Sequence, residues 1–158
     1  MVYQRDDRDE NWLKQARVVC GMGTCLRRRY GAIIVKDNRH LSQGYCGAAG
    51  GEEDCLSKGY CKRQDLQIPS GERYELCESV HAENNSVINA AILGVSIKGG
   101  TLYLCGEESE SKELADAIPC KMCARIIINA TLEKVITRTS TGGINIYTLD
   151  DLRQIIRN

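Results

Sequence analysis

This 158-residue chain has no excess of positive or negative charge, because its 21 lysine and arginine residues balance its 21 aspartate and glutamate residues. Sequence-independent binding to nucleic acid or to acidic membranes depends on excess positive charge. One tryptophan, seven tyrosines and no phenylalanine also leave few rings for base stacking. We therefore do not expect nucleic acid as a partner.

Long apolar runs are missing as well. No segment approaches the ~18 apolar residues that cross a bilayer, and residues 1–12 contain no apolar stretch like that of a signal peptide. We therefore expect a cytoplasmic protein without a membrane partner. With two prolines and no internal repeat, nothing resembles an interdomain linker, so we expect one domain over residues 1–158.

Cysteine is abundant, with nine residues. In a reducing compartment, clustered cysteines more often bind metal or carry chemistry than form disulfides, and an odd number cannot pair completely within one chain. The question is therefore which cysteines share a metal ion.

The apolar pattern predicts alternating strands and helices. Apolar residues at helical spacing predict helices over residues 11–19, 81–95, 120–129 and 150–157. Short apolar runs predict strands over residues 31–36, 39–45, 101–105, 134–137 and 145–148, of which the first two form a hairpin. This order predicts an α/β sandwich, with helices on the faces of one mixed five-stranded sheet.

Two segments interrupt this pattern. Residues 46–78 are rich in glycine and charge and have little periodicity, which predicts a long loop with four cysteines in it or beside it. Loops of this length are usually functional or tethered. Residues 106–118 form an acidic insertion, which carries Glu107, Glu108, Glu110, Glu113 and Asp116 against Lys112.

Two short motifs suggest a metal site. On a helix, Cys120 and Cys123 lie on one side and can reach a single tetrahedral ion. A helix N-terminus also lowers the pKa of a thiol toward the thiolate that a metal requires. With His81 as the third ligand, zinc keeps a fourth position for water, as catalytic sites do. Glu83 is then placed to move protons between that water and a substrate.

Each motif alone has a plainer interpretation. A single Cys-x-x-Cys is often half of a structural zinc site or a redox pair. His81 can be a capped core histidine, with Cys120 and Cys123 as small buried residues. Together, each opening a predicted buried helix, the motifs match the signature His-x-Glu and Pro-Cys-x-x-Cys of zinc-dependent nucleobase deaminases.

Residues 9–138 resemble the cytidine and deoxycytidylate deaminase superfamily, and most of all its bacterial deoxycytidylate (dCMP) deaminase branch. Besides the two motifs, the matching segments are TCLRRRYGAIIV at 24–35, GYCGA at 44–48 and IPSGERYELC at 68–77. The resemblance implies a cytidine-deaminase-like three-layer α/β/α sandwich and the zinc-dependent hydrolysis of dCMP to dUMP and ammonia. It also implies a homo-oligomer, a hexamer or a dimer, with a deoxynucleoside triphosphate effector.

The resemblance implies a role for each motif residue. Zinc on His81, Cys120 and Cys123 would lower the pKa of a bound water toward about 7 for attack on C4 of the pyrimidine. Glu83 would take the water proton, protonate N3 and help ammonia leave. Asn85 is a candidate for positioning the base.

The resemblance also implies a second, structural zinc, because some dCMP deaminases hold one in the corresponding places. Those places are Cys25, Cys55, Cys61 and Cys77. Four thiolates form a closed shell suited to pinning a long loop. The plainer alternative is scattered free thiols. Cys20 and Cys105 receive no role.

Substrate recognition departs from the family pattern. Cys46 replaces the asparagine that contacts the sugar, and a thiol is a weaker hydrogen-bond partner than an amide. Residues 106–118 would repel phosphate unless they fold away or meet a cation. Arg28, in the basic triplet 27–29, is a candidate phosphate ligand, although the triplet can equally be a solvated face or pair with the acidic insertion. Tyr45 is a candidate for packing on substrate, or for structural packing.

Two other functions stay open. Cys46 and the acidic insertion favour a deaminase that acts on a different amino-substituted base or nucleotide. A non-catalytic zinc-binding regulatory module is the second alternative, but Glu83 disfavours it because a structural site needs no proton carrier.

Overall fold

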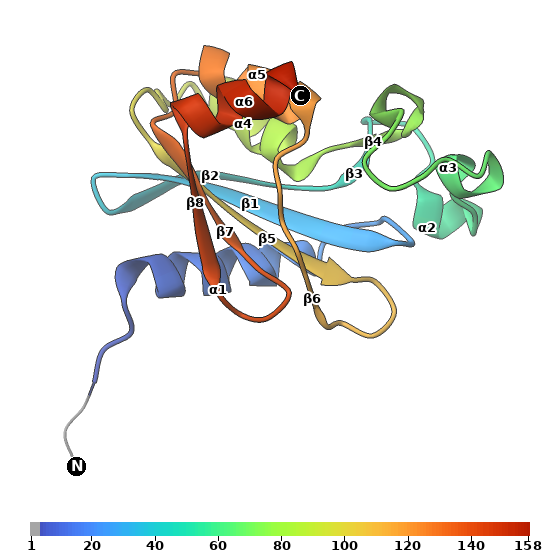
Figure 1. The fold of residues 1–158 in the computed structure, drawn as a ribbon, viewed down its shortest axis with the longest axis horizontal. Helices are drawn as coiled ribbons and strands as arrows, with labels where there is room; N and C mark the ends of the chain where they lie inside the picture. The colour runs from blue at the N-terminus through green and yellow to red at the C-terminus, as the bar shows by residue number, and fades with distance from the viewer. Residues whose placement is uncertain (1–3) are drawn as a thin grey trace.

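The computed structural model describes residues 4–158 (Figure 1). Its strands are β1 (Arg28–Lys36), β2 (Arg39–Tyr45), β3 (Gly47–Ala48), β4 (Ser79–Val80), β5 (Thr101–Glu108), β6 (Leu114–Ala115), β7 (Lys134–Arg138) and β8 (Ile144–Thr148). Its helices are α1 (Arg8–Cys20), α2 (Cys55–Lys58), α3 (Lys62–Asp65), the 3-10 helix η1 (Tyr74–Leu76), α4 (Ala82–Leu93), α5 (Lys121–Asn129) and α6 (Leu149–Arg157). None of the helices described is long and apolar enough to cross a membrane.

The main sheet is mixed, as predicted. Its strands lie in the order β2-β1-β5-β7-β8, with β5 and β7 parallel and the other neighbours antiparallel. β1 and β2 form the predicted hairpin, in which Asp37 and Asn38 adopt φ values of 49° and 57°. A two-residue hairpin turn requires such left-handed values. The parallel pair exists because the chain returns from the end of β5 through α5 before it enters β7.

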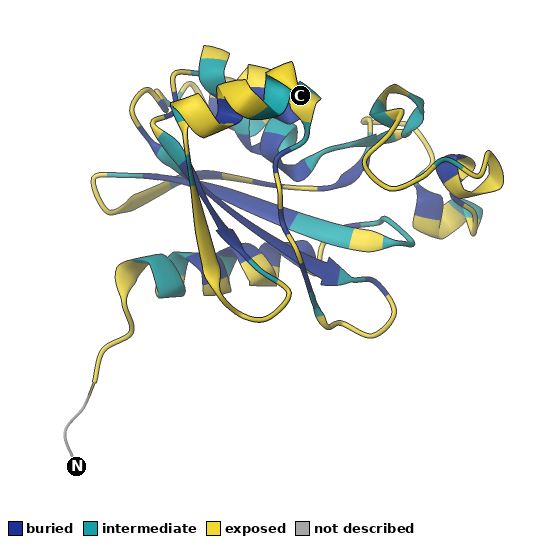
Figure 2. Ribbon diagram, viewed as in Figure 1, coloured by how far each residue is buried: buried dark blue, intermediate teal, exposed yellow. Residues whose placement is uncertain are grey.

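Helices cover both faces of this sheet, which confirms the predicted three-layer sandwich (Figures 1 and 2). On one face, α1 buries Leu13 against Ile33 and Tyr103. On the other face, Ile34 packs in the core with Ile127 of α5. Neighbouring residues of β1 therefore serve opposite cores, as the alternation of side chains along a strand requires.

The acidic segment 106–118 belongs to the sheet, which has six strands rather than the predicted five. β5 continues to Glu108, and its last residues pair antiparallel with β6. The carboxylate of Glu107 is buried and lies 3.9 Å from Nε of Arg17 on α1. The extension was not predicted because polar and acidic residues replace the apolar run after Cys105.

Residues 46–78, predicted as a long loop, contain several short elements. α2, α3 and η1 form a lobe beside one end of the sheet, at the right of Figure 1, and β3 pairs with β4 where the chain returns to α4. Asp54 caps α2 by accepting a 2.8 Å hydrogen bond from the amide of Ser57, and Gly59 ends the helix with a φ of 74°. Such short helices leave no periodic pattern in a sequence.

Candidate functional site

Two helix starts bring His81, Cys120 and Cys123 together. His81 immediately precedes α4, Cys120 immediately precedes α5, and Cys123 lies in the first turn of α5. Nδ1 of His81 lies 3.5 Å from Sγ of Cys120 and 3.4 Å from Sγ of Cys123. The cluster forms because α4 and α5 contact each other over the same face of the sheet.

These three donors fit a tetrahedral zinc ion. Two ligands of such an ion, each bound at about 2.0–2.3 Å, lie about 3.5–3.8 Å apart, and the three donor atoms here all lie within 4.8 Å of one another. One nitrogen and two sulfurs leave a fourth position for another ligand. That donor set is the one found in catalytic zinc sites, whereas structural sites fill all four positions from the protein.

Hydrogen bonds within the cluster favour the charged forms of the imidazole and one thiol. Burial lowers the pKa of His81, but hydrogen bonds to Cys120 and Cys77 outweigh it and bring the pKa to about 11. Hydrogen bonding with Cys123 lowers the pKa of Cys120 to about 4, while the same bond and burial raise the pKa of Cys123. Without a metal, the cluster therefore pairs the Cys120 thiolate with a protonated His81. Zinc would displace the imidazole proton, because only a neutral imidazole binds metal.

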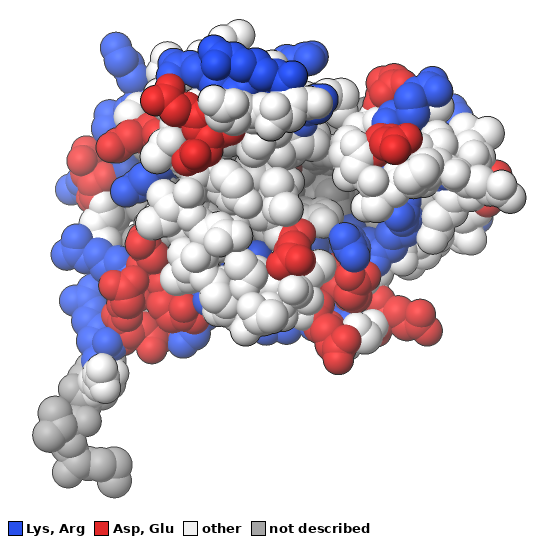
Figure 3. All heavy atoms as spheres, viewed as in Figure 1, with Lys and Arg blue, Asp and Glu red and all other residues white. Residues whose placement is uncertain are grey.

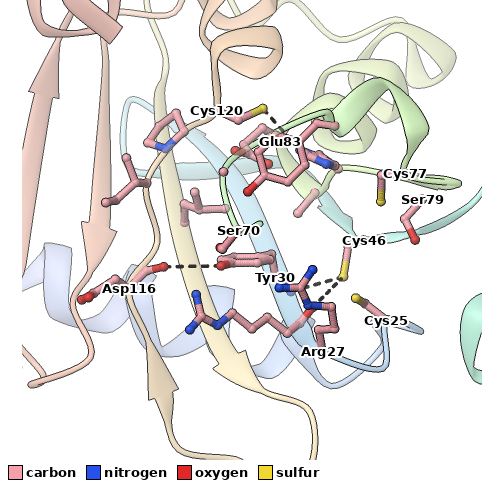
Figure 4. A pocket seen from close by; sticks show the side chains of 18 of the residues that line it. Cys25, Arg27, Tyr30, Cys46, Ser70, Cys77, Ser79, Glu83, Asp116 and Cys120 are labelled. Carbon is pink, nitrogen blue, oxygen red and sulfur yellow. Dashed lines mark hydrogen bonds between the residues drawn. The ribbon is translucent and has the colours of Figure 1, made fainter. Parts of the chain in front are cut away.

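Glu83 lies in the first turn of α4 and is only 5% exposed. Burial raises the pKa of its carboxyl, and the charge of His81 opposes that rise. Figure 4 shows Glu83 close to Cys120 at one end of a cavity. A carboxyl whose pKa is raised above its ordinary value accepts a proton more readily and can then return it.

The cavity in front of this cluster has a volume of about 510 Å³, within the range of small-molecule sites. His81, Glu83 and Cys120 line it. Elsewhere in its wall the hydroxyl of Tyr30 donates to the backbone carbonyl of Asp116 at 3.4 Å (Figure 4). In Figure 3 the surface is hollowed between the main body of the molecule and the lobe that contains α2 and α3.

A family model described as the cytidine and deoxycytidylate deaminase zinc-binding region matches residues 6–139. The chain belongs to this family. The deoxycytidylate deaminase of Mycobacterium phage D29 is 30% identical over 137 residues, which cover 84% of this chain and 94% of the phage protein. The deoxycytidylate deaminase of Schizosaccharomyces pombe is 26% identical over 132 residues, and the chain spans only 37% of that longer protein.

A solved structure agrees with the deaminase fold. The crystal structure of dCMP deaminase from the cyanophage S-TIM5, in complex with dCMP and dUMP, matches with a TM-score of 0.64 and 23% identity. The match covers 97% of this chain and 95% of that chain. The fold expected from the deaminase resemblance is therefore confirmed.

The candidate substrate residues of this chain fall into two groups. Cys46 and Arg28 line the cavity, and Asn85 and Tyr45 are not among its lining residues. Cys46 is buried, and its Sγ accepts a 3.3 Å hydrogen bond from the amide of Tyr30. Nδ2 of Asn85 donates to the carbonyl of Tyr45 at 2.7 Å, so this pair joins α4 to the end of β2.

The four cysteines predicted to hold a second metal gather at the lobe side of the cavity. Cys25 and Cys77 line the cavity, and Cys55 and Cys61 are buried at the starts of α2 and α3. Burial raises the pKa of Cys55, and charge on Cys25, Cys61 and Cys77 adds to that rise. The sulfur atoms of these three cysteines are therefore close enough to Cys55 for their charges to act on it. Within residues 4–158, no three of these four thiols lie within 4.8 Å of one another.

Tyr74 and Arg63 line the cavity and were missed by the sequence analysis. The ring of Tyr74 stands edge-on to that of His81, with centroids 5.1 Å apart and planes at 88°. Cζ of Arg63 lies 4.4 Å from the centre of the Tyr74 ring. Both residues belong to the aperiodic segment 46–78. Tyr74 lies in the stretch 68–77 that matches the deaminase family, which was an available signal, whereas Arg63 had only its nearness along the chain to Cys61.

Cys20 and Cys105, which had received no role, belong to the core between α1 and the sheet. Sγ of Cys20 donates to the backbone carbonyl of Cys105 at 3.0 Å. Both side chains are fully buried and pack as small apolar residues. All nine cysteines of the chain are free thiols in the structure.

Proposed function

We propose that the chain hydrolyses the 4-amino group of dCMP to give dUMP and ammonia. The observation that carries this proposal is the buried carboxyl of Glu83, which lines one cavity together with His81 and Cys120 of the zinc cluster. A purely structural zinc site needs no such proton carrier, so the arrangement disfavours a non-catalytic regulatory module. The relatives named deoxycytidylate deaminase support dCMP as the substrate.

His81, Cys120 and Cys123 are the residues that would hold zinc. A bound zinc acts as a Lewis acid and activates a water molecule. Glu83 accepts a proton at its carboxylate and delivers it to N3 of the cytosine ring, which makes C4 more electrophilic. The carboxylate then takes the second proton of the attacking water from the new hydroxyl on C4 and passes it to the 4-amino group, which leaves as ammonia while C4 becomes a carbonyl. Because Glu83 is buried, its proton partners are the atoms in the cavity rather than bulk water.

A deaminase that acts on a different amino-substituted base or nucleotide is the second candidate, and Cys46 favours it. This residue stands where the resemblance places a sugar-contacting asparagine, and its sulfur already accepts a hydrogen bond from the amide of Tyr30. A thiol engaged in this way offers little to a sugar hydroxyl.

Ammonia release from zinc-loaded protein tests these candidates. The panel is dCMP, CMP, deoxycytidine, dCTP, cytosine and guanine, and we expect the highest kcat/KM with dCMP. Release from another compound, with none from saturating dCMP, would establish the alternative substrate. Zinc-loaded protein that releases ammonia from no compound would point to the regulatory module.

We also propose that Cys25, Cys55, Cys61 and Cys77 hold a second, structural zinc. Among the described residues, none from segment 46–78 belongs to either hydrophobic core. A segment without a core of its own is the kind that a structural metal stabilises. The amide of Leu56 donates to the carbonyl of Thr24 at 3.1 Å, so the start of α2 is attached beside Cys25.

A homo-oligomer, hexamer or dimer, is the proposed assembly. Ile88 and Ile92 of α4 are 47% and 76% exposed and share one side of the helix. A second copy of this chain is the partner that we propose for that face. A deoxynucleoside triphosphate is the proposed effector, as the resemblance implies, and the cytoplasm is the proposed compartment, since nine free thiols suit a reducing environment.

A further inference from the structure

Arg63 is a buried cation that forms no ion pair with a carboxylate within residues 4–158, and its charge contributes to the lowered pKa values of Cys77 and Glu75. The residue is 5% exposed, and its Nη2 atom donates to the backbone carbonyls of Pro69 and Glu72. Its buried Nε atom has no hydrogen-bond partner. A buried charge is costly unless it is paired, so this position favours the arrival of an anion.

The position of Arg63 relative to the catalytic cluster suits a nucleotide. Its guanidinium lies 4.4 Å over the ring of Tyr74, and that ring lies 5.1 Å from the ring of His81. One aromatic ring therefore separates the guanidinium from the imidazole. A 5′-nucleotide has a matching layout, because one sugar ring separates its base from its phosphate. A nucleotide whose base lies at Glu83 therefore has the length to reach Arg63 with its phosphate.

The other cations of the cavity are less suited to this role. Arg28 already pairs with Glu108 at 2.7 Å, and their side chains are 46% and 38% exposed. Lys121 is exposed, and Arg27 is only partly buried. Solvent and salt weaken charge attraction most at exposed positions, so the deeply buried Arg63 offers the strongest one.

We propose, on the basis of the proposed dCMP activity, that Arg63 binds the 5′-phosphate of the substrate. This contact makes the cavity select a nucleoside monophosphate over the free nucleoside. Tyr74 is a positioning residue, because its ring supports the guanidinium through a cation–π contact. The carbonyls of Pro69 and Glu72 fix the guanidinium through its Nη2 atom. Phosphate oxygens then supply the charge-assisted hydrogen bonds that Arg63 lacks within the protein.

The test compares kcat/KM for dCMP and for deoxycytidine. We expect Arg63→Gln to lower the value for dCMP by about 10- to 100-fold, the usual effect of losing hydrogen bonds to a charged group. The value for deoxycytidine should change less than about twofold, since that substrate has no phosphate to lose. Arg63→Lys should recover part of the loss, because it keeps the charge without the fork. Arg73→Gln is the matched control, since it removes an exposed charge from the same segment outside the cavity lining.

Equal losses with dCMP and deoxycytidine would overturn the proposal, because they would show that Arg63 only supports the segment. If Arg63→Gln does not fold, Arg63→Lys takes its place in the test. The quantity compared is the ratio of kcat/KM for dCMP to kcat/KM for deoxycytidine, and a ratio unchanged from the wild type overturns the proposal. Calorimetric titration with dUMP and deoxyuridine measures the phosphate preference without turnover. A protein that deaminates nothing, yet loses its preference for dUMP in Arg63→Gln, would refute the proposed function and leave the role of Arg63 supported.

Discussion

Nε of Arg28 donates a 2.7 Å hydrogen bond to the Glu108 carboxylate, and the two residues are direct partners in the register of β1 and β5. The basic triplet offsets most of the net negative charge of the acidic segment 106–118, and here the two meet in space at the cavity that Arg28 lines. We expected the acidic segment to repel phosphate unless it folds away from the cavity or meets a cation. The contact with Arg28 fulfils the second condition.

We expect Glu108→Gln to lower KM for dCMP by up to about fivefold, equivalent to ~1 kcal/mol. The reason is that Arg28 loses its carboxylate partner, so the cavity gains positive charge. Steady-state kinetics measures the change, which should shrink at high salt. Glu110→Gln, at an exposed position outside the cavity lining, is the control. A higher KM in Glu108→Gln would contradict the expectation.

Glu83→Gln should reduce kcat by about 10²- to 10⁴-fold, the usual contribution of a positioned acid–base group. The amide keeps the shape of the side chain but does not take up and return the proton. Metal analysis should find the same zinc content as in the wild type, because Glu83 is not one of the proposed ligands. Glu133→Gln, at an exposed position remote from the cavity lining, is the control. Full activity in Glu83→Gln would refute the assigned role.

Metal analysis of the purified protein should find two zinc ions per chain. Cys55→Ser should lose one of them and make segment 46–78 sensitive to proteolysis, because that segment contributes nothing to the two described cores. Cys120→Ser is the matched variant, and we expect it to lose the other zinc and all activity while the segment stays resistant. A single zinc in the wild-type protein rules out the second site.

Gly44→Ala should destabilise the protein by about 1–3 kcal/mol, as overpacking does. A Cβ atom at this position would overlap the backbone nitrogen of Ser86 and the carbonyl oxygen of Ala82, in the first turns of α4. At this chain length the melting temperature falls by about 2–4 °C per kcal/mol, so thermal unfolding measures the change. The control is Gly50→Ala, because a Cβ there meets nothing within 4 Å. Equal melting temperatures for the two variants would show that β2 does not press on α4.

Ile92→Glu should lower the mass of the assembly in sedimentation velocity, because it places a charge on the apolar face of α4. Val18→Glu is the control, since Val18 is 79% exposed on α1 at the opposite side of the sheet. An unchanged mass in Ile92→Glu would exclude this face of α4 from the interface.

The order of elements was predictable because apolar periodicity survives in the buried helices and strands. Their ends were less predictable, because capping decides them. α1 begins at Arg8, before the predicted residue 11, since the side chain of Asp7 accepts a 2.9 Å hydrogen bond from the amide of Asp9. β5 runs past its predicted end because β6 pairs with it, a contact that no local pattern reveals.

The sequence by itself determined the family and the kinds of side chain at the site. His81 and Glu83 form one short motif and Cys120 and Cys123 another, and each motif fits within one helical turn, so it can be read without knowledge of the fold. Only the tertiary structure decided that α4 and α5 begin side by side, and that Arg63 and Tyr74 face the same cavity. It also decided that Asn85 and Tyr45 join two elements to each other. The reason is physical: these contacts join segments far apart in the chain, and they follow from strand register, from the parallel crossover through α5 and from a segment without periodicity.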